Sequence, residues 1–192
     1  MKKFITTLAI AATSFAASAQ IWKIDPAHTG IHFSAKYLLV SEVEGQFKKI
    51  DGTVNTVKPD WTDLNVNIII DVNSLTTDND MRDNHLKSDD FFNAEKFPTI
   101  TFKSTSMKMV DSKNYIMKGE LTIRDVTKIV EIPVKFGGIV KDPWGNVKAG
   151  FKGVGQINRK DFNLKYSNLA ATGEAVVSDL IDFRIDVILV KQ

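Results

Sequence analysis

The sequence predicts an all-β fold of about eight antiparallel strands closed into a barrel, with a short helical insertion near residues 77–95. Three observations predict it. Apolar and polar residues alternate along most of the chain, turn-forming residues separate the alternating runs, and a single segment loses the alternation. A period of two is typical of strands with one buried and one wet face.

Residues 1–19 are predicted to be a secretory signal peptide. Lys2 and Lys3 precede a short apolar run, and the small residues of 17–19 (Ala-Ser-Ala) form a cleavage site. The apolar run is shorter than the roughly 20 residues that a membrane-spanning helix needs. We therefore expect export to the periplasm and a mature domain, residues 20–192, that does not span the membrane.

The strands of the mature domain are expected where the alternation is strongest. The alternating runs cover residues 31–37, 64–72, 100–102, 115–123, 130–136, 149–153 and 181–189. Turn signals such as 137–138 (Gly-Gly) and 142–145 (Asp-Pro-Trp-Gly) lie between runs, and the 124–128 link is short enough for a hairpin. Glycines within these runs suit the sharp bends of a closed barrel better than a flat sheet.

Residues 75–97 are the segment that loses the period of two. Thr77 is expected to be the N-cap of a helix, because an acidic residue, Asp80, follows three positions later. Two pairs at i,i+4 spacing, Asp78 with Arg82 and Asp83 with Lys87, would stabilise the helix surface. A proline at position 98 then ends the helix.

The composition gives no support for nucleic-acid binding, metal binding or catalysis. Without the signal peptide, 23 basic residues balance 23 acidic ones, because Lys2 and Lys3 are two of the 25. No basic stripe suggests a nucleic-acid partner. The chain has no cysteine and three histidines, His28, His32 and His85, whose spacing matches no zinc site. We therefore expect no metal, no cofactor and no catalytic residues.

The ordered motifs of the chain resemble those of the YceI-like family of exported bacterial proteins, described as polyisoprenoid-binding and lipocalin-like. These motifs are WKIDPAH at 22–28, IHF at 31–33, VEGQF at 43–47, IDG at 50–52, SLTT at 74–77, RDNHL at 82–86, SDDFF at 88–92, FP at 97–98, ITFKS at 100–104, GELTI at 119–123, DPWG at 142–145 and NRKDF at 158–162. The chain departs from many relatives at Tyr37, Asp125 and Ile129, where they carry histidine, glycine and proline. The resemblance implies a lipocalin-like barrel that holds an isoprenoid or fatty-chain lipid in an apolar interior, without enzymatic activity.

The alternation also predicts which side chains face that interior. The expected ligand-binding lining is Phe33, Ala35, Tyr37, Phe47, Leu64, Val66, Ile68, Ile100, Phe102, Leu121, Val134, Phe151, Ile185 and Val187. Parity alone does not separate residues that would contact ligand from residues that only fill the core, because one bulge exchanges the two faces.

The helical insertion must lie outside the barrel wall, so we expect it to cover an open end as a lid. Phe91 and Phe92 would be buried there, while Arg82 and His85 would hold the lid to neighbouring loops by hydrogen bonds. Two alternatives remain open at this point. Arg82, Asp83 and His85 could form the acid–base cluster of an enzyme, or the barrel could have a filled core and serve as a structural or stress protein that binds protein partners. The sequence does not indicate the oligomeric state.

Overall fold

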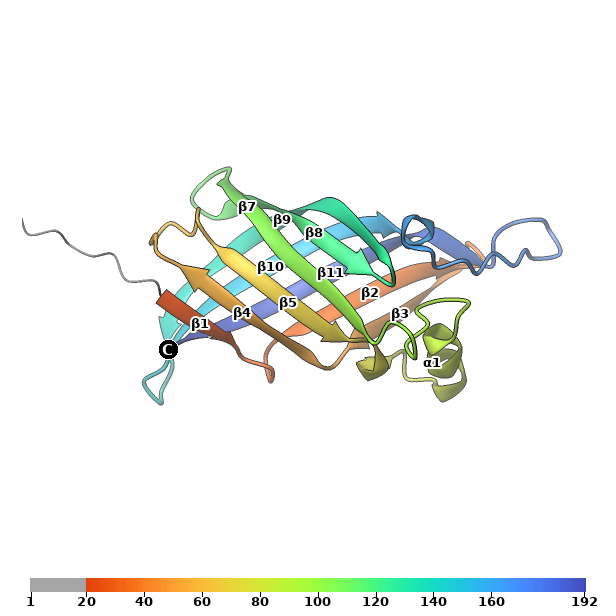
Figure 1. The fold of residues 1–192 in the computed structure, drawn as a ribbon, viewed down its shortest axis with the longest axis horizontal. Helices are drawn as coiled ribbons and strands as arrows, with labels where there is room; N and C mark the ends of the chain where they lie inside the picture. Colours follow the sequence, from red (N-terminus) through yellow and green to blue (C-terminus); the bar gives the residue numbers. More distant parts are fainter. Residues whose placement is uncertain (1–19) are drawn as a thin grey trace, which may run out of the picture.

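The computed structural model describes residues 20–192, and the predicted signal peptide of residues 1–19 lies outside them. Figure 1 shows an elongated barrel of tilted strands with the helix α1 (Asp80–Lys87) at one end. The strands are β1 (Gln20–Ile24), β2 (Gly30–Tyr37), β3 (Ser41–Phe47), β4 (Ile50–Thr56), β5 (Asn65–Asp71), β6 (Leu75–Thr76), β7 (Thr99–Met109), β8 (Asn114–Ile123), β9 (Val126–Lys141), β10 (Val147–Asn158) and β11 (Val177–Lys191). Two short 3-10 turns, η1 (Val72–Ser74) and η2 (Arg159–Phe162), complete the fold.

The eleven strands occupy eight positions around the barrel. β1 and β2 follow one another along the same edge of β11, and β3 and β4 follow one another along β2 and β1. The short β6 extends the position of β5 by pairing with β3. Because β1 pairs with both β4 and β11, the sheet closes on itself. The predicted antiparallel barrel of about eight strands with a short helical insertion is confirmed.

Strand β5 illustrates why the chain adopts this register. Val66 and Ile70 are buried in the barrel, whereas Ile69 is 50% exposed on the outer face. Ile69 is the residue that interrupts the alternation in the sequence. It does not change the register, because the hydrophobic gain comes from the residues on the inner face.

The two ends of the barrel are built differently. At the end that carries the C-terminus in Figure 1, Trp61 packs against Trp22, Phe136 and Phe151 with ring centroids 5.1–5.6 Å apart. We call this the closed end, because these rings fill the barrel there. At the opposite end, the mouth, α1 and the turns up to residue 97 lie across the opening.

The helix begins two residues later than the sequence suggested. Its N-cap is Asn79, whose side chain accepts a hydrogen bond from the N–H of Arg82 at 3.0 Å. The expected cap, Thr77, instead donates its hydroxyl and its N–H to Asp83. Neither predicted i,i+4 pair, Asp78 with Arg82 or Asp83 with Lys87, is among the ion pairs of residues 20–192.

Candidate binding cavity

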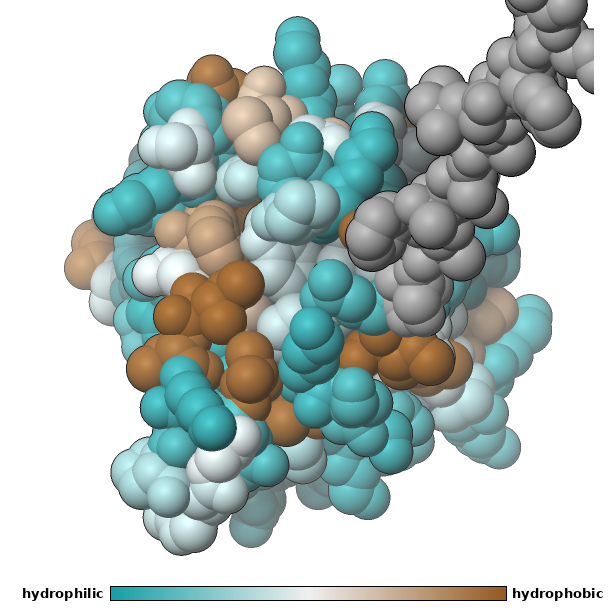
Figure 2. Space-filling view, turned by 90° about the vertical axis from the view of Figure 1, so that its left-hand side faces the viewer, coloured by the Kyte–Doolittle hydropathy of each residue, from teal (hydrophilic) through white to brown (hydrophobic). Residues whose placement is uncertain are grey.

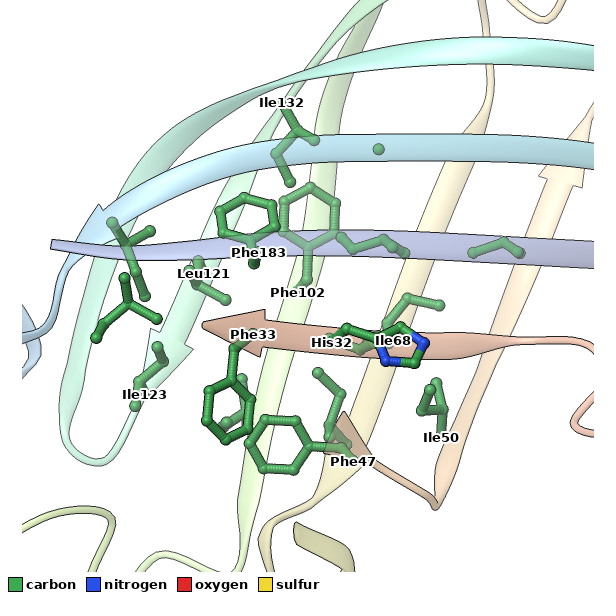
Figure 3. A pocket seen from close by; sticks show the side chains of 18 of the residues that line it. His32, Phe33, Phe47, Ile50, Ile68, Phe102, Leu121, Ile123, Ile132 and Phe183 are labelled. Atoms are coloured by element: carbon green, nitrogen blue, oxygen red, sulfur yellow. The ribbon is translucent and has the colours of Figure 1, made fainter. Parts of the chain in front are cut away.

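A cavity of about 250 Å³ runs inside the barrel between the closed end and the mouth. Figure 3 shows that its wall is made by side chains from strands on all sides, among them Phe33, Phe102 and Phe183. Its volume is close to the lower limit of about 300 Å³ that is usual for small-molecule sites. The interior is therefore not filled by its own side chains.

The wall of the cavity is apolar almost throughout. Of its 34 residues only Thr29, His32 and Arg159 carry a polar side chain, and hardly any polar surface faces the cavity. The buried guanidinium of Arg159 donates hydrogen bonds to the carbonyl oxygen of residue 164 in the loop that follows it, and to the carbonyl oxygens of 177 and 178 and the carboxylate of Asp179 at the start of β11. Burial lowers the pKa of Arg159 below its usual value, although arginine stays protonated. A molecule inside the cavity would thus contact hydrocarbon.

The interior stays hollow because several phenylalanine rings lie flat against the wall, each over a glycine. A Cβ atom at the glycine would come within 2.3–2.4 Å of the ring's Cζ atom, so the ring occupies the space that a side chain would take. The pairs are Phe33 with Gly45, Phe102 with Gly119 and Phe183 with Gly155. A larger residue at the glycine would push the ring towards the centre of the barrel.

Most of the lining predicted from the sequence is found at the cavity. The residues at the wall are Phe33, Ala35, Phe47, Leu64, Val66, Ile68, Ile100, Phe102, Leu121, Val134, Phe151, Ile185 and Val187. Tyr37 is the exception, because β2 ends there at the mouth and the side chain is 40% exposed. Whether the other thirteen bind a ligand stays a prediction.

The sequence reasoning missed further wall residues. Ile70 and Phe183 share the parity of residues already chosen, so the alternation could have identified them. Ile50 and Arg159 carry no such signal. Ile50 follows a break between β3 and β4, and Arg159 lies in η2 outside any strand.

The segment at the mouth contributes three apolar side chains to the wall, Leu86, Phe91 and Phe92. Phe91 is buried and stacks on Tyr166 with ring centroids 4.9 Å apart. Phe92 is only half-buried and meets Phe47 edge to face at 5.8 Å. Both rings line the cavity at the mouth, and whether the segment acts as a lid stays a prediction.

Arg82 and His85 do not hold this segment to its neighbours by hydrogen bonds, contrary to expectation. Arg82 donates to the hydroxyl and the carbonyl of Thr77, and His85 pairs with Asp90 at 2.9 Å, so both bonds stay within the segment. Both partners are close in sequence, and the helix places them within reach. His85 meets the loop after η2 through a perpendicular ring contact with Tyr166, with centroids 5.3 Å apart.

Arg124, in the two-residue turn between β8 and β9, makes the contact that was expected of Arg82 and His85. Its Nη1 donates to the carbonyl oxygens of Asp89, Phe91 and Asn163 at 2.8–2.9 Å. Its Nη2 donates to the carboxylate of Asp89 at 2.7 Å. One side chain therefore ties the mouth segment both to the barrel hairpin and to the loop after η2.

The possible acid–base cluster of Arg82, Asp83 and His85 does not converge on one point. Arg82 and Asp83 are linked only through Thr77, whose hydroxyl accepts from Arg82 and donates to Asp83, and His85 is paired with Asp90 and not with Asp83. Burial raises the pKa of Asp83, but the hydrogen bonds from Thr77 outweigh burial and leave the pKa below its usual value. A carboxylate of low pKa that is already bonded is a poor general base.

Two further properties of residues 20–192 bear on the site. No three side chains of histidine, aspartate or glutamate in this part of the chain are grouped so that they could hold a metal ion. Within the same residues, no helix has the length and hydrophobicity needed to cross a membrane.

Comparison with known proteins finds the same architecture in named relatives. The model of the YceI-like domain matches residues 22–189. Protein YceI of Escherichia coli is 38% identical over 170 residues, which cover 86% of this chain and 88% of the relative. A solved YceI protein of Campylobacter jejuni is 29% identical with a TM-score of 0.70, and the match covers 100% of this chain and 99% of that one.

A more distant likeness concerns the fold alone. A polyisoprenoid-binding domain of Saccharophagus degradans superposes with a TM-score of 0.68 at 13% identity, over 89% of this chain and 98% of that domain. The same barrel fold is thus found at very low sequence identity.

Proposed function

Since this chain belongs to the YceI-like family, we propose that it is a non-enzymatic carrier that holds an isoprenoid or another long-chain amphiphilic lipid inside the barrel. The observation that carries the proposal is the hollow, apolar interior. The alternative, a structural protein with a filled core, would be expected to pack the interior of the barrel with its own side chains. The polyisoprenoid-binding domain with the same fold agrees with the ligand class.

The affinity would come from burying hydrocarbon. Each methylene group removed from water contributes about 0.8 kcal/mol, so one five-carbon isoprene unit contributes roughly 3–4 kcal/mol before the cost of ordering the chain. The wall turns hardly any polar surface towards the cavity. The head group of the lipid would therefore stay at the mouth, while the hydrocarbon chain enters the cavity.

Native mass spectrometry of the purified protein tests the proposal. We expect a retained prenyl or fatty-chain lipid, or uptake of one when geranylgeraniol is offered, at one molecule per chain. Extraction should return the lipid chemically unchanged, because a carrier performs no reaction. If the protein neither retains nor takes up any chain lipid, the proposal is wrong, and a modified lipid would favour an enzyme.

The carrier is proposed to act in the periplasm. The support is the signal-peptide pattern of residues 1–19, with cleavage after Ala19. Fractionation of cells that express the full chain should place the protein in the periplasmic extract, and N-terminal sequencing should begin at Gln20. A cytoplasmic protein that starts at Met1 would contradict this location.

A further inference from the structure

Two turns without any charged residue lie next to each other at the rim of the mouth. We call them the rim tips: residues 37–41 (Tyr-Leu-Leu-Val-Ser), between β2 and β3, and residues 167–173 (Ser-Asn-Leu-Ala-Ala-Thr-Gly), in the loop that projects beyond α1 in Figure 1. The N–H of Leu38 donates to the carbonyl of Val176, whose N–H donates to Asn168, both at 3.0 Å. These bonds hold the two tips side by side.

The rim tips expose apolar side chains where a soluble protein usually places charges. Leu39 is 60% exposed, Val40 84% and Leu169 66%. A quarter of the whole chain is charged, so twelve residues would on average include three charges, and these twelve include none. Exposed apolar patches of this kind mark surfaces that contact a partner or a membrane.

The backbone of the first tip is also unfavourable for its residues. Leu38 and Leu39 have φ angles of 51° and 59°, and Val40 closes the turn by donating to Tyr37. A turn with two positive φ angles is normally made by Asn-Gly, because a leucine side chain is strained in that conformation. Strain that persists at an exposed position points to a function of the side chains.

We propose that the rim tips insert into the interfacial region of a lipid bilayer and dock the mouth onto it. The inference rests on the proposed function, because a carrier must collect its lipid from a membrane. Tyr37 pairs with Val177, which lines the cavity, so the tips border the opening directly. The uncharged tips match the uncharged interior of the bilayer, and docking should therefore depend little on salt.

The closed end provides a matched comparison. Figure 2 shows hydrophobic patches on this end of the molecule. In β9, next to the turn at this end, Ile139 and Val140 are 55% and 63% exposed. Neither of these two residues lines the cavity. The neighbouring turn of residues 142–145 has a glycine, Gly145, at its positive φ angle. The closed end thus has comparable hydrophobicity but neither the strained leucines nor access to the cavity.

Flotation with vesicles of phosphatidylcholine and phosphatidylethanolamine tests the proposal, using lipid-free full-length mature protein. We expect the wild type to float with the vesicles at both low and high salt. The variant L39D/V40D should lose about tenfold or more in vesicle binding, because charges replace apolar groups in the interface. The control I139D/V140D should bind like the wild type.

A second variant separates docking from folding. L38N/L39G should melt at a higher temperature, because it relieves the strained turn, and should still bind vesicles more weakly. Absence of flotation by the wild type, or an equal loss in the closed-end control, would overturn the proposal. A dimer in light scattering that L39D/V40D dissolves would show that a second copy covers the tips, which also overturns it.

Uptake of geranylgeraniol measured without vesicles keeps the two proposals apart. A protein that takes up the prenol but does not float remains a carrier that lacks this docking surface. If the protein floats with vesicles but takes up no prenol or fatty chain, the docking surface is supported and the proposed carrier function is wrong.

Discussion

Two arginine side chains organise the irregular segments at the mouth. Arg159 binds the loop after η2 and the start of β11, and Arg124 binds the mouth segment and the same loop. Both side chains are buried, at 3% and 6% exposure. Arginine suits this position because its planar group can serve several carbonyl oxygens at once and always keeps its charge.

Replacing Arg124 with alanine should loosen the mouth. The carbonyls of Asp89, Phe91 and Asn163 would lose their donor, and we expect the free energy of unfolding to fall by about 2 kcal/mol. Release of a bound fluorescent prenyl lipid in stopped flow should be faster than in the wild type. Arg82→Ala is the control, because Arg82 bonds only within its own segment; faster release from that variant alone would contradict the assignment.

The glycines beneath the phenylalanine rings should determine how much lipid the barrel holds. In Gly155→Ala the new Cβ would lie 2.4 Å from the Phe183 ring and drive it into the cavity. We expect binding of geranylgeraniol to weaken by about tenfold, or 1.4 kcal/mol. The double variant Gly155→Ala/Phe183→Leu should recover most of this affinity in a titration. No recovery would show that the ring does not set the width of the cavity.

At the scale of single elements, each strand of the barrel separates an apolar inner face from a polar outer face. The separation survives a local irregularity such as the register shift after Ser104 in β7. Before the shift the buried residues are Ile100 and Phe102, at even positions, and after it the buried residue is Met107, at an odd position. The Ser104 hydroxyl accepts the N–H of Val66 on β5 at 2.8 Å. The bulge thus keeps apolar side chains on the inner face although the parity along β7 changes.

Substitutions at two neighbouring positions on β5 test which face of the strand is turned towards the cavity. Ile68→Asp places a carboxylate against the cavity wall, and we expect loss of lipid retention with a fall of about 3 kcal/mol or more in the free energy of unfolding. Asn67→Asp, on the outer face, should change stability by no more than about 0.5 kcal/mol. Urea melts and native mass spectra of both variants measure this. Equal tolerance at the two positions would mean that the faces are reversed.

At the scale of the whole molecule, loops at both ends are fastened by aspartates that accept hydrogen bonds. At the closed end Lys148 lies between Asp25 and Asp142, at 3.0 and 3.7 Å, and joins the β9–β10 hairpin to the link between β1 and β2. Hydrogen bonds to side chains and to turn N–H groups lower the pKa of six such carboxyls. They are Asp25, Asp60, Asp89, Asp111, Asp125 and Asp142.

These lowered pKa values predict how stability depends on pH. A carboxyl whose pKa is lower in the folded state stabilises the fold above its ordinary pKa of 3.8, and this contribution is lost as the pH falls through the folded value. The melting temperature should therefore stay nearly level from pH 7 to about pH 5 and fall below about pH 4. Asp142→Asn should make the acid decline shallower in calorimetry. A melting temperature that rose on acidification would contradict the prediction.

The sequence by itself determined which residues of the barrel wall face the interior and which face outwards. A period of two assigns every strand residue to one of two faces, and the gain from burying the apolar face is large enough to override single exceptions such as Ile69. For the same reason thirteen of the fourteen residues expected to face the interior do so. The family motifs, which are spread along the whole chain in order, identified the family correctly.

Only the tertiary structure decided what lies beyond the ends of the strands. Tyr37 follows the inward parity of β2 but stands at the rim, because parity does not reveal where the wall ends. Arg124 and Arg159 fasten the mouth through carbonyl oxygens that are distant in sequence, and no local pattern encodes such contacts. The cavity itself depends on rings that lie over glycines of adjacent strands. A hollow barrel and a filled barrel have the same alternating sequence pattern. The pattern indicates which side of the wall a residue faces, but it does not indicate how much space is left inside the barrel.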